Sequence, residues 1–167
     1  MIMDSSVSVC PVPDEQQPIN QYQELQESWF FSWVTLDLKN YIMKLAWIWG
    51  WSWLIAGPLA AASFTPQKYL IHFLICGAAG AGFFVVLTLL RLYLGWSYIC
   101  DRLLSETIFY EESGWYDGQT WTKPPSVLTR DRLIVSYQIQ PILQRLKRTF
   151  GILALFVGGG SLIWNLF

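Results

Sequence analysis

The chain has 167 residues, of which 53% are hydrophobic and 17% aromatic, but only 14% are charged. This balance is too apolar for an ordinary soluble domain and predicts an integral membrane protein. Eleven Lys and Arg against twelve Asp and Glu leave no broad basic surface, which argues against nucleic acid as a partner. The cysteines have no zinc-site spacing and are expected to be reduced thiols; they are Cys10, Cys76 and Cys100.

The chain begins with a polar segment, residues 1–28, that contains several prolines. We expect this segment to be a tail and residues 29–167 to form a single membrane domain. Met1 to Trp29 contains no Lys or Arg and no apolar run, so no cleavable signal is expected there. Targeting should then depend on the apolar helices themselves.

Three nearly charge-free runs, residues 45–64, 69–90 and 150–167, have the length of membrane-spanning helices. As helices they would extend about 30, 33 and 27 Å, enough to cross the apolar part of a bilayer. Helices are favoured over strands because lipid offers no partners to unpaired backbone groups. The sequence therefore predicts an all-α integral membrane protein with three transmembrane helices, the first two joined as an antiparallel hairpin by Phe64 to Gln67.

Basic residues are distributed unevenly around these spans. Two precede the first span and eight lie in residues 91–149, whereas Lys68 alone lies on the other side. The positive-inside rule then places the N-terminus and residues 91–149 in the cytoplasm, or in the stroma of a plastid.

The first span contains Trp47, Trp49, Trp51 and Trp53 in the stretch WIWGWSW. Because these residues alternate by two, a helix points them toward two nearly opposite faces. We interpret them as an interfacial aromatic belt, with a platform for a pigment, quinone or lipid ring as the alternative. Gly57-Pro58 predicts a kink in the same helix.

The second span carries small residues at i and i+4, which allow a neighbouring helix to approach closely. The expected partner is another span of this chain, and a helix of a larger complex is the alternative. These helix-packing residues are Gly77, Ala78, Ala81 and Gly82.

The only histidine, His72, lies about one turn inside the second span. An ionisable group there could ligate the metal of a haem or chlorophyll. The chain has no second histidine and no Glu-x-x-His pattern at this position, so a neutral histidine near the membrane surface is favoured. No cofactor is predicted, and His72 is kept as the one candidate ligand.

Residues 91–149 are expected to form a cap on the cytoplasmic or stromal side. The second helix should continue to about Ser105, and ETIFYEE then has the composition of a strand. Asp117-Gly118 is a strong hairpin turn, with Ser113-Gly114 as a competing one. A turn at Asp117-Gly118 pairs Glu112 with Lys123 and Gly114 with Trp121.

After Pro124-Pro125 the chain is expected to restart as an amphipathic helix. Apolar residues repeat at steps of four, three, four and four, which indicates one buried stripe. Pro141 lies within this helix and should bend it by freeing the Tyr137 carbonyl. The stripe comprises Val135, Ile139, Ile142, Leu146 and Phe150.

The cap contains carboxylates that could in principle support acid–base chemistry or metal binding. Strand alternation points Glu111 and Glu112 to opposite faces, and no phosphate-binding, nucleophile or dinucleotide motif accompanies them. No catalytic or metal-binding residue is predicted. Arg130-Asp131-Arg132 is interpreted as a set of ion pairs with the acidic hairpin, with a binding role as the alternative.

Long stretches of the chain resemble a known family. CPVPDEQQPINQYQELQESWFFSW, YICDRLLSETIFYEESGWYDGQTWTKP and LTRDRLIVSYQIQPILQRL are similar to the hypothetical chloroplast reading frame thirty-six family, also described as conserved in the green lineage and diatoms. The resemblance covers nearly the whole chain. It implies a photosynthetic membrane and an accessory role, such as complex assembly or acclimation to stress, and it supplies no catalytic residues.

The sequence features and the resemblance are compatible with three functions. The leading hypothesis is a non-enzymatic accessory protein of the thylakoid membrane, in contact with lipid, that docks a photosynthetic complex through its cap and tail. The alternatives are a pigment-, quinone- or haem-binding protein that uses the first span and His72, and a membrane enzyme that uses the cap carboxylates. The docking candidates are Cys10, Pro11, Trp115, Tyr116, Asp117, Gly118, Trp121, Arg130, Asp131 and Arg132.

Overall fold

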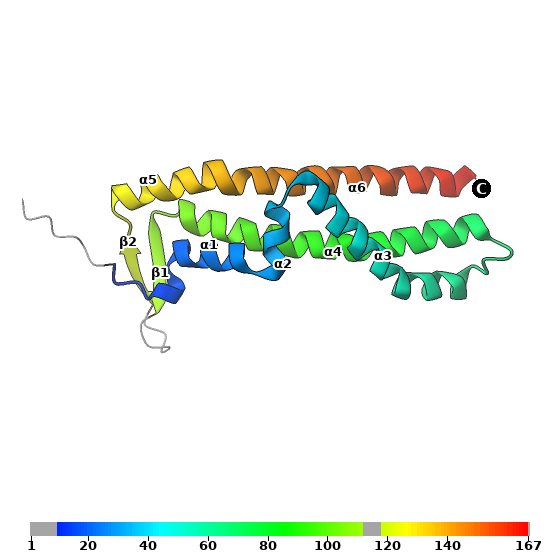
Figure 1. The fold of residues 1–167 in the computed structure, drawn as a ribbon, viewed down its shortest axis with the longest axis horizontal. Coiled ribbons are helices and arrows are strands. Elements are labelled where there is room, and N and C mark those ends of the chain that lie inside the picture. The colour runs from blue at the N-terminus through cyan, green and yellow to red at the C-terminus, as the bar shows by residue number, and fades with distance from the viewer. Residues whose placement is uncertain (1–9, 112–117, 167) are drawn as a thin grey trace, which may run out of the picture.

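The protein is an elongated helical molecule with a small β-hairpin at one end (Figure 1). The structure, a computed structural model, describes residues 10–111 and 118–166, the last three by their backbone alone. Its central element is helix α4, Leu70–Leu104, against which the other long helices pack. Helix α3, Leu38–Ser63, runs back along α4, and helix α6, Gln140–Leu166, follows it on another side.

Within the described residues, three helical segments are long and apolar enough to cross a membrane, as the sequence predicts. The helices are longer than the apolar spans: α3 begins at Leu38, and α4 ends at Leu104, which confirms the predicted end near Ser105. The extension of α4 is stabilised by buried apolar side chains at helical spacing. They are Leu89, Leu92, Trp96, Ile99 and Leu103.

The N-terminal segment packs on α4. A 3₁₀ turn, Asp14–Gln16, leads into helix α1, Pro18–Glu27, which lies along α4. Tyr22 of α1 is buried edge-on against Trp96, with ring centroids 6.2 Å apart. The expected tail is therefore, over residues 10–27, a folded part of the same core.

A short aromatic segment connects α1 to α3. Helix α2, Trp29–Ser32, and a 3₁₀ turn, Trp33–Thr35, carry the chain to α3. The Phe31 ring lies so close to α4 that a Cβ added at Gly95 would be only 2.5 Å from it. The absence of a side chain at position 95 therefore allows the Phe31 ring of the connecting segment to contact the surface of α4.

The return helix begins as α5, Pro125–Ile134, and passes through a π-helical turn, Val135–Ile139, into α6. The Gln140 N–H donates to the Val135 carbonyl across this turn. Pro141 has no N–H, and its ring crowds the carbonyl four residues earlier, so the wider turn lets the helix continue past it. The predicted apolar stripe is confirmed, since four of its members are buried and Phe150 packs against them.

The hairpin consists of β1, Thr107–Glu111, and β2, Gly118–Thr122, in antiparallel pairing. Ile108 lies opposite Trp121, and Glu111 lies opposite Gly118. The predicted register is therefore wrong, because Gly118 belongs to the strand and Trp121 does not face Gly114. In the observed register Trp121 lies opposite Ile108 and packs against the buried Ile108 and Tyr110. Residues 112–117, including the predicted turn residue Asp117, lie outside the described residues.

The four tryptophans of α3 divide between two faces, as expected. Trp49 and Trp53 pack edge-on to each other on the face toward α4, where the Trp49 indole N–H donates to the Ala78 carbonyl at 3.4 Å. Trp53 covers Gly77 so closely that an added Cβ would lie 2.7 Å from its ring. Ala81 is fully buried, whereas an added Cβ at Gly82 would meet nothing within 4 Å.

Replacement of Gly77 by Leu should destabilise the contact between α3 and α4. The new side chain overlaps the Trp53 ring, and such overpacking costs about 1–3 kcal/mol in the free energy of unfolding. Thermal unfolding in detergent, followed by circular dichroism, measures the loss. Gly82→Leu is the matched control, since its site is open; equal melting temperatures for the two variants would contradict this packing.

Candidate functional site

The polar end of the molecule is organised around the buried side chain of Lys123. This residue follows β2 directly, and its side chain is 0% exposed. Its ammonium donates to Asp131 Oδ2 at 2.9 Å, to the Arg102 carbonyl at 3.0 Å and to the Leu103 carbonyl at 2.9 Å. Three donors thus meet three acceptors, which a buried ammonium requires.

The acceptors come from two helices. Arg102 and Leu103 belong to the last turn of α4, whose carbonyls lack helical partners and carry the negative end of the helix dipole. Asp131 belongs to α5, and its side chain is 2% exposed. Lys123 therefore caps α4 and joins it to both the hairpin and the return helix.

The neighbouring arginines make weaker pairs. Arg130 donates to Asp131 Oδ1 at 3.1 Å, and Arg132 lies 3.5 Å from Glu106 Oε1 at an exposed position. Glu112, the partner expected for Lys123, lies outside the described residues, whereas the Lys123 ammonium pairs with Asp131. Among the described residues, Arg132 is the arginine that pairs with an acid at the start of the hairpin, Glu106.

The inner face of the hairpin packs on the N-terminal segment. Val12, Ile108 and Tyr110 form a small buried cluster, with Cys10 and Trp121 partly buried against it. The Trp121 side chain thus lies on the inner face of the hairpin, whereas the docking role expected for it would need an outward side chain. Pro11, beside this cluster, is exposed.

The Gln16 side chain pairs with the edge of β1 in the manner of a neighbouring strand. Its amide donates to the Glu111 carbonyl at 2.8 Å, and its oxygen accepts from the Glu111 N–H at 2.9 Å. Arg102 donates to the Gln16 carbonyl at 3.0 Å, which fixes the segment to α4. The outward backbone groups of Glu111, at the end of the β1 edge, are therefore bonded within the protein itself.

A small cavity of about 170 Å³ lies between these elements. Its wall is mixed, with Trp121 and Ile108 on the apolar side and Arg130 and Asp131 on the polar side. Cys10 also lines it, and all three cysteines are free thiols.

The outer face of the hairpin exposes Phe109, whose side chain is 71% accessible. Sequence reasoning did not single out this residue, although strand alternation places it opposite the buried Ile108 and Tyr110. Trp115, Tyr116 and Asp117, the other expected docking residues of the hairpin, lie outside the described residues. Gly118 is exposed at the start of β2.

A second hydrogen-bonded group connects α1 to the return helix. The Tyr22 hydroxyl donates to Gln138 Oε1 and accepts from the Gln26 amide. Burial raises the pKa of Tyr22 above its ordinary value, and the Gln26 hydrogen bond partly offsets this effect. Tyr22 therefore serves as a neutral connector at physiological pH.

A ring of aromatic and basic contacts, here named the waist, surrounds the middle of the molecule. Arg145 donates to the carbonyls of Val34 and Leu36 at 2.9 and 2.6 Å. Tyr41 Oη lies 2.9 Å from Thr149 Oγ1, which joins α3 to α6. The waist also contains three cations above aromatic rings: Arg145 over Tyr41, Arg91 over Phe31 and Lys147 over Tyr93.

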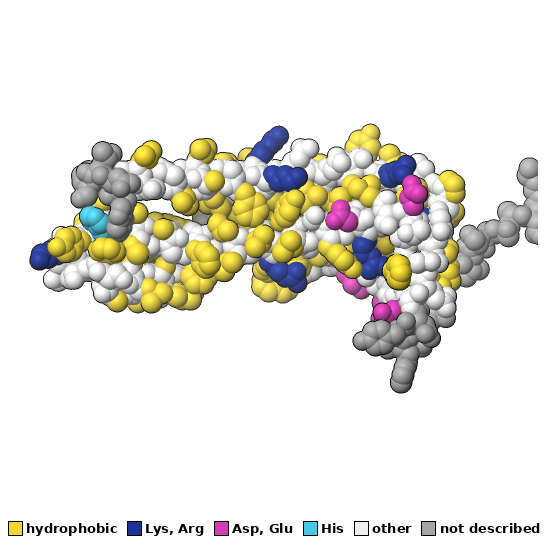
Figure 2. Space-filling model, turned by 180° about the vertical axis from the view of Figure 1, so that it is seen from behind, with side chains coloured by type: hydrophobic (Ala, Val, Ile, Leu, Met, Phe, Trp, Pro, Cys, Tyr) yellow, Lys and Arg dark blue, Asp and Glu magenta, His cyan; other side chains and the backbone are white. Residues whose placement is uncertain are grey.

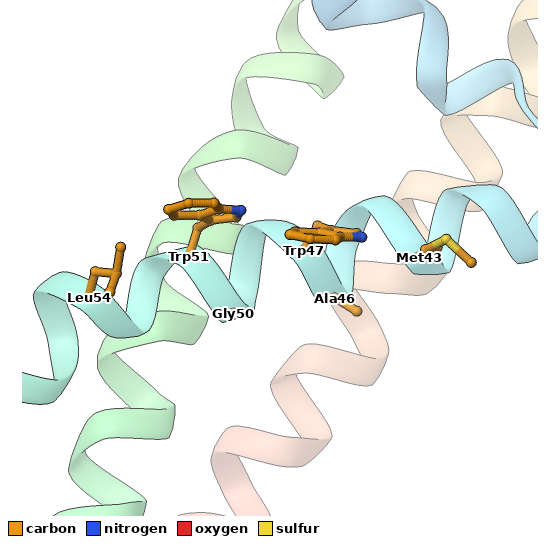
Figure 3. A pocket seen from close by; sticks show the side chains of 6 residues that line it. All are labelled: Met43, Ala46, Trp47, Gly50, Trp51 and Leu54. Atoms are coloured by element: carbon orange, nitrogen blue, oxygen red, sulfur yellow. The ribbon is translucent and has the colours of Figure 1, made fainter.

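A shallow apolar groove of about 500 Å³, open to the surroundings, lies on the outward face of α3, between Trp47 and Trp51 (Figure 3). These indoles are 60% and 62% exposed, and Gly50 separates them. His72 lies on α4 instead, where its ring stacks on Phe64 with centroids 5.6 Å apart. The structure thus does not bring His72 and the outward tryptophans together.

The cap carboxylates are also separate. Asp131 is held by Lys123, Glu106 pairs with Arg132, and Glu111 is exposed in β1. In the described ranges 10–111 and 118–166, no cluster of three His, Cys, Asp or Glu side chains could hold a metal ion.

Removal of the Asp131 charge should strongly destabilise the polar end. In Asp131→Leu the buried Lys123 ammonium loses its counter-charge, and breaking such a pair costs about 3–5 kcal/mol in the free energy of unfolding. Chemical denaturation in detergent measures the change. Glu106→Gln, which breaks only the exposed pair with Arg132, should change stability by less than about 1 kcal/mol.

The double variant Lys123→Met, Asp131→Leu removes both charges. It should recover much of the loss, because no unpaired ion remains buried. A single Asp131→Leu variant as stable as the unaltered protein would show that the ion pair does not organise this end.

Comparison with known proteins shows a family match over most of the chain. Residues 10–152 match the CGLD27-like family, described as conserved in the green lineage and diatoms 27. The chloroplastic protein of that name from Arabidopsis thaliana is 45% identical over 157 residues, which make up 93% of this chain and 46% of that protein. The chain therefore spans about half the length of that relative.

Relatives of similar length carry the name uncharacterized protein ycf36. The one from Cyanophora paradoxa is 47% identical over 92% of this chain and 97% of its own length, and the one from Pyropia yezoensis is 41% identical over 95% and 96%. No solved structure matches the chain. With the match to residues 10–152 and these identities, the resemblance noted in the sequence is confirmed, and the chain belongs to the CGLD27-like family.

Proposed function

We propose that the protein is an accessory, non-enzymatic component of a photosynthetic membrane that docks a membrane protein complex through its polar end. Chloroplast relatives support a plastid or thylakoid location. The charge pattern supports insertion, since no acidic residue lies in residues 38–100 or after Asp131. On the visible face in Figure 2, acidic side chains occur only toward the hairpin end, and the other half is largely apolar.

The waist marks the proposed boundary of the bilayer. Arg91 directly follows the second apolar run, residues 69–90, and Arg145 and Lys147 precede the third, residues 150–167, so these cations lie at one end of the apolar helices, where they can contact lipid headgroups. Figure 2 shows basic side chains gathered across the middle of the molecule. The hairpin, α1 and α5 then form a cap outside the membrane on the cytoplasmic or stromal side.

The exposed Phe109 is the observation that carries the docking proposal. A large apolar side chain on a strand is an energetically favourable anchor when its backbone is already fixed. Here the inner face of the strand is buried, and the hairpin continues into the Lys123 ion pair. A partner can therefore bury Phe109 without ordering the strand that carries it.

The edge of β2 adds a second docking element. Gln16 bonds the edge of β1 at Glu111, but no hydrogen bond from a described residue reaches the outward backbone groups of β2. The strand contains neither a charged residue nor a proline, the usual protection of a free edge. We infer that an extended segment of the partner can add to this edge.

The remaining alternatives have less support. Pigment or quinone binding has the groove beside Trp47 and Trp51 in its favour, but His72 lies on another helix. Enzymatic use of the carboxylates would need them in one place, and Asp131 is already held by Lys123.

The proposed orientation predicts a protease pattern. Trypsin added to the stromal or cytoplasmic side of sealed membrane vesicles should cleave at exposed basic residues of the cap, such as Arg130 and Arg132, and spare Lys68. Fragments identified by mass spectrometry measure the outcome. Detergent-opened vesicles, in which Lys68 becomes accessible, are the control. Cleavage at Lys68 with protection of the cap would reverse the topology.

Replacement of Phe109 by Ala should weaken docking while the protein stays folded. Truncation of an exposed anchor costs about 2 kcal/mol or more in binding, which is about thirtyfold or more in affinity. Affinity purification from native membranes, followed by quantitative mass spectrometry, measures the partners retained. Thr107→Ala, on the same exposed face of β1, is the matched control. A partner set unchanged by Phe109→Ala would count against docking through this face.

A further inference from the structure

We propose that the groove on the outward face of α3 is a binding site for one anionic glycerolipid. The site would hold an acyl chain between Trp47 and Trp51, with the negatively charged headgroup at the waist. This proposal rests on the membrane insertion proposed above but concerns a different surface from the docking cap.

The shape of the groove suits an acyl chain. It is lined by residues of α3 alone, which recur at helical spacing along one face. Its lining is overwhelmingly apolar, and Gly50 leaves its floor open, since an added Cβ there would meet nothing within 4 Å. Its walls are Met43, Ala46, Trp47, Trp51 and Leu54.

The indoles give the groove a direction. In Figure 3 the nitrogens of Trp47 and Trp51 both lie at the end of the ring nearer Met43, which is the end toward the waist. No described residue accepts a hydrogen bond from either nitrogen, whereas Trp49 on the opposite face has the Ala78 carbonyl. The outward indoles thus present two donors to an ester or headgroup oxygen at the membrane interface.

Two lysines lie at the same end. Lys39 precedes Met43 by four residues and Lys44 precedes Trp51 by seven, so helical geometry places them on either side of the groove. Both are exposed, and neither forms an ion pair with a described residue. The two lysines outnumber Asp37, the carboxylate that directly precedes α3, and so favour an anionic headgroup over a neutral or zwitterionic one.

Native mass spectrometry provides the test. The full-length protein is equilibrated in mild detergent with equal amounts of phosphatidylglycerol and phosphatidylcholine that carry the same acyl chains. We expect preferential retention of one phosphatidylglycerol molecule. Lys39→Gln and Lys44→Gln should each reduce the preference about fivefold. Lys68→Gln, at the opposite end of the spans, should leave it unchanged.

A second variant fills the groove without disturbing the fold. Gly50→Leu places a side chain in open space on the groove floor and should abolish retention, while the melting temperature stays the same or rises. Gly151→Leu on α6, also an open site, is the matched control and should retain the lipid.

The outcomes distinguish the lipid site from the broader proposal. Equal retention of both lipids, or retention in Gly50→Leu, would overturn the lipid site while membrane insertion stands. A pigment or quinone retained from native membranes, and lost in Gly50→Leu, would assign the groove to that ligand instead. Failure of the protein to associate with bilayers at all would overturn the membrane proposal itself.

Discussion

The polar end of this protein depends on one buried ammonium group. Lys123 has to leave water completely, which costs several kcal/mol unless each of its protons is bonded and its charge is paired. Only the observed arrangement of the α4 terminus and α5 provides that set of acceptors. The pair therefore acts on specificity: it selects one relative position of helix end, strand end and return helix from the many that hydrophobic packing alone would allow.

The waist likewise selects one relative position of the helices in the middle of the molecule. Arg145 bonds the carbonyls between α2 and α3, where the chain changes direction and those groups have no helical partner. Tyr41 is buried beside it and reaches Thr149 on α6. Between this ring and Lys123, helix α4 is continuous, so the cap has a fixed orientation relative to the apolar half (Figure 1).

Much of the architecture could be predicted from the sequence because apolar length and helical spacing are local signals. The three long helices and the stripe from Val135 to Phe150 follow from such signals. The fold of residues 10–27 could not be predicted from composition, because this segment is polar overall. Yet Ile19, Tyr22 and Leu25 recur every three residues and all pack on the core, a helical signal that composition conceals.

The hairpin register could not be predicted for a different reason. Asp117-Gly118 is the strongest local turn signal, but a local signal cannot state which side chains the rest of the protein will bury. The N-terminal segment, distant in sequence, supplies Val12 against Ile108 and Tyr110, and Trp121, which pairs with Ile108, packs against the same cluster. The Lys123–Asp131 pair was not predicted for the same reason. The other two acceptors of Lys123 are backbone carbonyls that become available only where α4 ends.

The two edges of the hairpin show how this arrangement bears on function. A free strand edge invites pairing with other chains, and proteins usually block it. Here Gln16, which Arg102 also holds against α4, bonds the β1 edge at Glu111, so that end of the edge is part of the folded core. The β2 edge has no such closure from the described residues, and Phe109 projects from the outer face of the same sheet. A hairpin with a dedicated side chain bonded to one edge, and with no described residue bonded to the other edge beside an exposed aromatic ring, has the asymmetry expected of a surface that is completed by a partner.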